Sequence, residues 1–118
     1  VSEAKYRTDA SFLANEILGQ MWANRANIAQ YQFPGGANND MIAWTNKVIA
    51  AMPDGAANPP QITIASVAGA NPSGAAPYTV HNVTVVVRWR LPADVSAGRA
   101  ARNFTTTAQM QVCASNLC

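Results

Sequence analysis

The sequence has little charge, one histidine and no long apolar run. Charged residues make up 12% of its 118 residues, about half the usual share for a soluble protein. No stretch reaches the roughly 18 consecutive apolar residues that a membrane-spanning helix needs, and no secretory signal pattern is present. The basic residues are scattered from Lys5 to Arg102 without a run. Charge alone therefore does not indicate nucleic-acid binding.

Catalytic groups are equally scarce. His81 is the single histidine, and the six carboxylates are spread from Glu3 to Asp94 without an acid–base pair on one element. The sequence has no nucleophile elbow, glycine-rich phosphate loop or cluster of metal ligands. We therefore predict a protein that is not an enzyme and that has no cofactor, metal ion or small-molecule substrate.

Two cysteines, Cys113 and Cys118, lie at the end of the chain. Their number and spacing favour a disulfide, which would close a small loop and would indicate a location outside the cytosol. Two free thiols are the alternative. A metal site would need two more ligands, which one histidine cannot supply.

The chain begins with a long helical pattern, from residue 1 to about 30. Apolar residues recur at intervals of three, four or seven positions, which places them on one stripe of a helix. At 1.5 Å per residue such a helix is about 40 Å long, and its abrupt start suggests a membrane-anchored half that precedes Val1. The stripe consists of Tyr6, Ala10, Leu13, Ile17, Met21 and Ile28.

The rest of the chain predicts a short helix and three strands. A run of turn residues precedes Asn38 and Asn39, either of which can cap a helix over about 41–52. Alternating patterns predict strands over about 61–67, 78–91 and 103–113. Their connections are too short for helical crossovers, so we expect an antiparallel meander of three or four strands.

These elements predict a single α+β domain over residues 1–118, in which the first helix packs on the sheet. The predicted helix–sheet core contains Tyr6, Leu13, Ile17, Met21, Val85, Val87 and Trp89.

The opposite side of the first helix combines two aromatic residues with small and polar ones: Phe12, Asn15, Gly19 and Trp22. Two interpretations remain open for Trp22. It is either covered by the loop that follows the helix, or it contacts another protein as part of an assembly face.

The order of elements and several local patterns resemble a type IV minor pilin of the PilV type. The resemblance covers most of the chain. It depends on Ala10–Ile17 leading to Met21–Asn27, on Trp44 followed by the turn Pro53-Asp54-Gly55, and on Val85–Trp89.

The resemblance implies a bacterial pilus subunit at the cell surface, anchored in the inner membrane before assembly by a cleavable half-helix that precedes Val1. Its partners would be other pilins and minor pilins. The implied role is priming or assembly of the fibre, in support of adhesion, motility or DNA uptake.

Two alternatives remain. A pseudopilin of a type II secretion system has the same helix-first plan, although the acidic loop cluster of its calcium-binding members is absent. Alternatively, the domain is a receptor for DNA or a host ligand. That role would depend on a basic patch formed by Arg88, Arg90, Arg99 and Arg102.

Overall fold

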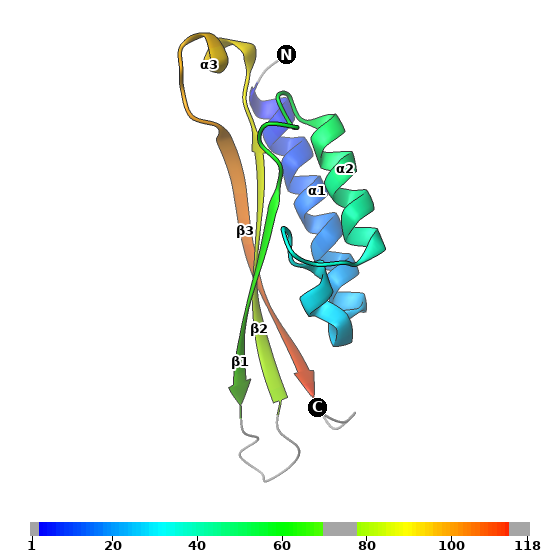
Figure 1. Ribbon diagram of the computed structural model, residues 1–118. Helices are drawn as coiled ribbons and strands as arrows, with labels where there is room; N and C mark the ends of the chain where they lie inside the picture. The colour runs from blue at the N-terminus through cyan, green and yellow to red at the C-terminus, as the bar shows by residue number, and fades with distance from the viewer. Residues whose placement is uncertain (1–2, 70–77, 114–118) are drawn as a thin grey trace.

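The computed structural model describes residues 3–69 and 78–113. It is an α+β fold in which a helix comes first and an antiparallel sheet follows (Figure 1), which confirms the predicted class. The sheet has three strands in the order β1-β2-β3, as a meander requires. The elements are α1 (Glu3–Ala23), the 3-10 helix η1 (Arg25–Tyr31), α2 (Asn39–Ala51), β1 (Gln61–Gly69), β2 (Tyr78–Trp89), α3 (Pro92–Ser96) and β3 (Arg102–Cys113).

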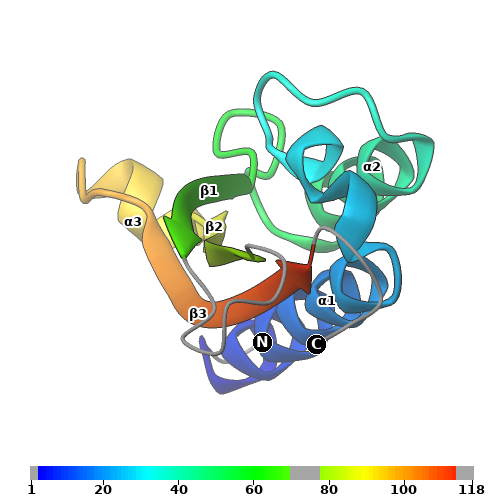
Figure 2. The ribbon, with the colours of Figure 1, turned by 90° about the horizontal axis from the view of Figure 1, so that it is seen from below.

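The central strand β2 has one buried face and one half-buried face. Val83, Val85, Val87 and Trp89 are fully buried, whereas the residues between them are half-buried. Side chains alternate across a strand, so one face is directed toward the helices and the other is open. Figures 1 and 2 show α1 and α2 together on one side of the sheet. The face of β2 that the alternating pattern predicted to be buried is therefore the face that packs in the core.

The first helix is shorter than the predicted span of 1 to about 30. α1 ends at Ala23, and Asn24 adopts φ −123° and ψ 36°, outside the helical region. The chain then tightens into η1, which buries Ile28 and Tyr31. The Asn24 side-chain amide donates to the Tyr31 hydroxyl over 3.3 Å. After the break at Asn24, η1 places Ile28 and Tyr31 in the same core cluster as the buried residues of α1.

The second helix is fastened to the first by packing and by one buried hydrogen bond. Asn38 is its N-cap and accepts from the Met41 N–H at 2.9 Å, a contact worth about 1 kcal/mol. The Trp44 indole N–H donates to the Leu13 carbonyl over 2.8 Å. Met41, Trp44 and Val48 are buried beside α1. α2 thus covers the flank of α1 and leaves its outer side open.

The predicted disulfide lies outside what the structure describes, because Cys118 is not described and only the backbone of Cys113 is. Among the described helices, none is both long enough and apolar enough to cross a membrane.

Candidate functional site

One side of α1 is sealed against the rest of the domain. Ala10, Ala14, Ile17 and Met21 have no exposed surface, and Leu13 is 8% exposed. The predicted core residues of β2 lie in the same cluster, and Tyr6 packs at its margin. We call this side the inner stripe of α1. Of the predicted core residues, Tyr6 is half-buried. The others are buried: Leu13, Ile17, Met21, Val85, Val87 and Trp89.

The other side of α1 carries the residues that the sequence singled out as an assembly face. Phe12 is 72% exposed and Trp22 is 51% exposed, and Asn15 and Gly19 are exposed as well. Successive members are three or four positions apart, so the four lie along one line on the helix surface. We call this line the outer stripe of α1. It is the candidate functional site.

Gly19 leaves the middle of the outer stripe without a side chain. A Cβ placed there would have no heavy atom within 4 Å, apart from the helix's own nearby backbone. Glycine in a helix interior costs about 0.5–1 kcal/mol relative to alanine, and neither a turn nor a positive φ requires it here. A close approach of another backbone is one physical use for such a gap.

A shallow groove adjoins Phe12 between α1 and α2. Its volume is about 290 Å³, and its lining includes Phe12, Leu13 and Ala51. The groove is bordered by an ion pair in which the Lys47 ammonium lies 2.9 Å from both carboxylate oxygens of Glu16. Both side chains are substantially exposed, so the pair contributes at most about 1 kcal/mol. Apolar and charged groups therefore border each other at this end of the outer stripe.

Trp22 is 51% exposed, so the segment that follows α1 does not bury it. Arg25, the first residue of η1, lies over its ring, with the guanidinium carbon 4.8 Å from the ring centroid. The same guanidinium donates to the Trp22 carbonyl over 3.1 Å. This cation–π contact is an exposed one, which makes it weak. Half of the indole remains available to a partner.

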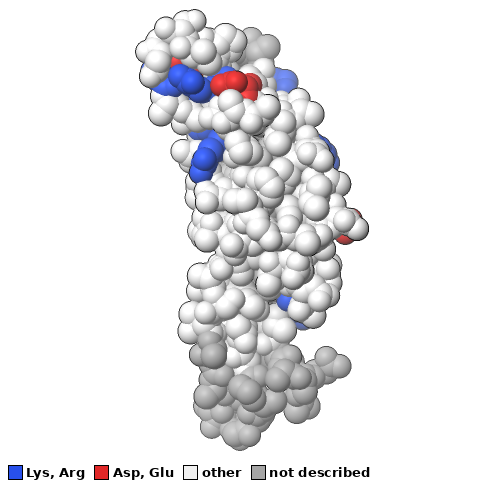
Figure 3. Space-filling view, in the orientation of Figure 1, with Lys and Arg blue, Asp and Glu red and all other residues white. Residues whose placement is uncertain are grey.

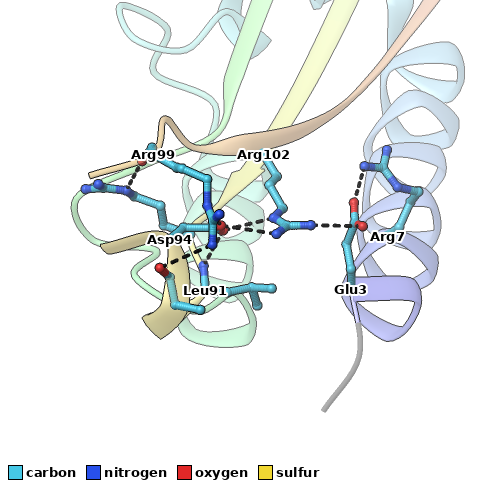
Figure 4. A network of polar contacts seen from close by, with 8 residues as sticks. Glu3, Arg7, Leu91, Asp94, Arg99 and Arg102 are labelled. Atoms are coloured by element: carbon cyan, nitrogen blue, oxygen red, sulfur yellow. Dashed lines mark hydrogen bonds and ion pairs between the residues drawn. The ribbon is translucent and has the colours of Figure 1, made fainter. Parts of the chain in front are cut away.

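A second cluster lies where α3 joins β2 to β3, and Figure 4 shows its polar contacts. Asp94 is 1% exposed. Its carboxylate accepts from Arg102 Nε at 2.9 Å, from Arg99 Nε at 3.1 Å and from the Leu91 backbone N–H at 3.1 Å. These donors, the Arg102 guanidinium above all, hold the pKa of Asp94 well below its usual range. Asp94 therefore organises the turn.

Arg102 extends this cluster to the beginning of α1. It lies 2.9 Å from a Glu3 carboxylate oxygen, and Arg7 donates to the other Glu3 oxygen over 2.6 Å. Arg7 also donates to the Asn103 carbonyl over 3.2 Å. The hydrogen bond from Arg7 is the main reason why the pKa of Glu3 is lowered. The contacts tie the first turn of α1 to β3.

The four arginines of the possible basic patch are occupied by partners in the domain. Arg99 and Arg102 bind Asp94, Arg90 donates to the Arg99 carbonyl over 2.8 Å, and Arg88 donates to Gln61 over 2.8 Å. Blue and red atoms accordingly adjoin each other at the α3 end of the molecule (Figure 3). This arrangement favours a structural role for the arginines.

His81 contacts Ser66, with 2.7 Å between the imidazole Nδ1 and the hydroxyl oxygen. Within residues 3–69 and 78–113, no group of three or more histidine, cysteine, aspartate or glutamate residues is placed to hold a metal ion.

The role of Asp94 as an organising residue was not predicted from the sequence. Its signal was local: Pro92 stands at the start of α3, and an acidic residue at the third helical position is typical of a capping box.

Comparisons with protein-family models, curated proteins and solved structures gave no match.

Proposed function

We propose that this domain is a minor pilin subunit of a type IV pilus, and that the outer stripe of α1 contacts neighbouring pilins in the fibre or in the complex that starts it. The observation that carries the proposal is the exposure of Phe12 and Trp22, 72% and 51%, on one line of a helix whose other side is sealed. The helix-first α+β order and the three-stranded meander support it.

The stripe is suited to helix-against-helix packing. Burying a large apolar side chain yields about 1.5–3 kcal/mol, so Phe12 and Trp22 together provide a useful part of an association energy. Gly19, between them, permits a close backbone approach. Glu16 and Lys47, at the Phe12 end of the stripe, are already paired, so little uncompensated charge is desolvated at that end.

The proposed location follows from the proposed role. The domain faces the periplasm while the subunit is anchored in the inner membrane, and it lies on the outside of the fibre after assembly. Fibre growth would then support adhesion, motility or DNA uptake.

Two variants of the full-length protein test this proposal. Phe12→Ala removes the exposed ring, and Gly19→Leu fills the gap in the stripe. We expect both to reduce the number of pili per cell at least several-fold, counted by electron microscopy in cells that lack the wild-type copy. Both isolated domains should stay folded, because Phe12 is 72% exposed and a Cβ at position 19 meets no heavy atom within 4 Å outside the nearby backbone of its own helix.

Ile42→Ala is the matched control, because Ile42 is an exposed apolar residue, 44% accessible, on α2 and away from the stripe. It should leave piliation at the wild-type level. Normal piliation in both stripe variants would refute the proposed contact face. A complete deletion of the gene that leaves piliation unchanged would refute the pilin role itself.

A further inference from the structure

The outer edge of β1 is only partly paired. On this edge Phe33 forms a two-way antiparallel bridge with Ile62: the Phe33 N–H donates to the Ile62 carbonyl over 3.1 Å, and the Ile62 N–H donates to the Phe33 carbonyl over 3.0 Å. Past Ile62, no backbone of the described residues pairs with this edge. Figure 1 shows the lower end of β1 at the margin of the sheet, with β2 on its other side.

The bridge also shows which backbone groups point outward. Both groups of Ile62 face Phe33, and the backbone groups of a strand alternate between its two edges. Those of Ile64, Ser66 and Ala68 therefore face the free edge, whereas those of Thr63 and Ala65 face β2. Residues 64–68 present a short, regular row of donors and acceptors.

Among the residues that the structure describes, this row lacks several of the devices that usually protect an edge strand. Natural edges are blunted by lysine, proline, inward charges or a β-bulge. β1 contains no charged residue and no proline, and its pairing with β2 runs from Gln61 to Gly69 without a bulge. Val67 is 59% exposed beside the row. The edge is thus suited to accept another strand.

We infer that β1 pairs antiparallel with β1 of a second copy of this chain, around a two-fold axis at Ser66. In this register Ile64 lies opposite Ala68 of the other copy, and the bridge from Phe33 ends the pairing at Ile62. A two-fold axis at Ser66 brings the residues at and beside Ser66 close to their own counterparts, so a charge there would meet a like charge. β1 has none, and its edge already accepts an antiparallel strand at Ile62.

The pairing is weak in dilute solution. A row this short buries far less than the roughly 1,000 Å² of a stable interface. Dimers should therefore form at high protein concentration, or where copies are held close together. The inference rests on β1 and its bridge to Phe33 and does not depend on the proposed function.

Amide hydrogen exchange measured by NMR at about 20 μM and about 1 mM protein tests the pairing, since the concentrations bracket the expected weak association. Protection of the Ile64, Ser66 and Ala68 amides should rise at least several-fold at the higher concentration. The Thr63 and Ala65 amides already face β2 and should not change. Unchanged protection of the outward amides, or a change confined to other elements, would overturn the inference.

Two substitutions at Ser66 provide a test variant and its matched control. Ser66→Pro removes the central outward donor without removing a hydrogen bond to β2, so sedimentation equilibrium should show a monomer at about 1 mM, a concentration at which weak interfaces associate. Ser66→Ala loses only the hydroxyl contact with His81 and should dimerise like the wild type.

If Ser66→Pro fails to fold, Val67→Lys is the second variant, because it places like charges near the axis from an exposed position. Dimerisation that is undiminished in the folded variant, at low salt, would refute the pairing.

Discussion

The inner and outer stripes of α1 belong to one helix, but they differ in how much of their surface the rest of the domain covers. On the inner stripe, Ile17 and Met21 are completely buried, whereas on the outer stripe Phe12 is 72% exposed. Single exposed apolar residues are common, but here a phenylalanine and a tryptophan lie along the same line. The difference teaches that apolar character alone does not identify the core. The inner stripe contributes to folding, and the outer stripe is available for association.

A cavity in the inner stripe should have the largest effect. Ile17→Ala removes a fully buried side chain, and such changes lower the free energy of unfolding by about 2–5 kcal/mol. Phe12→Ala, on the outer stripe, should change it by less than about 0.5 kcal/mol. Urea denaturation of the isolated domain, followed by circular dichroism, measures both. Equal losses in the two variants would show that the stripes do not differ as described.

The attachment of the first turn of α1 is ionic, and acid should weaken it. Asp94 and Glu3 both have lowered pKa values, caused chiefly by Arg102 and Arg7 respectively. A carboxyl whose pKa is lower in the folded state stabilises the fold above its unfolded pKa, and this stabilisation is lost as the pH falls further. The melting temperature should therefore be level near neutral pH and should fall below about pH 4.

Asp94→Asn tests this ionic contribution, because it removes the carboxylate that Arg99 and Arg102 share. We expect a lower melting temperature at pH 7 and a shallower decline in acid. Asp40→Asn, at an exposed position in α2, should keep the wild-type acid profile. A variant at Asp94 that melts like the wild type at every pH would show that the Asp94 carboxylate does not stabilise the fold.

The smallest effect should be a gain in stability on the outer stripe. Gly19→Ala should raise the free energy of unfolding by about 0.5–1 kcal/mol, because alanine loses less backbone entropy in a helix. The added methyl group meets no other part of the domain. Thermal and urea denaturation of the isolated domain will measure the change. A destabilised Gly19→Ala domain would mean that the folded domain itself needs the glycine, which would weaken its assignment to association.

Much of the fold could be predicted from local patterns. The alternation from Val83 to Trp89 predicted the buried face of β2, and the spacing of Leu13, Ile17 and Met21 predicted the inner stripe. The end of the first helix could not be predicted in this way. Ile28 continues the helical spacing, but it is buried from η1, after a break at Asn24. Helical periodicity states which residues share a face and does not state where tertiary packing bends the chain.

The candidate site, too, was predicted from local spacing in part and depends on tertiary structure for the rest. The sequence placed Phe12, Asn15, Gly19 and Trp22 on one side of a helix, and all four are exposed in the structure. The sequence did not decide whether Trp22 is covered by the loop after the helix or contacts another protein. The 51% exposure of Trp22 is inconsistent with burial beneath the segment after α1, and contact with another protein stays a prediction.

The sequence by itself determined the α+β class, the order of α1, α2 and the three strands, and the faces of α1 and β2. It could do so because the periods of 3.6 and 2 residues are properties of the backbone. Only the tertiary structure decided that Arg102 joins Asp94 to Glu3 and that no described backbone pairs with the outer edge of β1 past Ile62. Both depend on which distant segments lie side by side, and local spacing does not encode that adjacency.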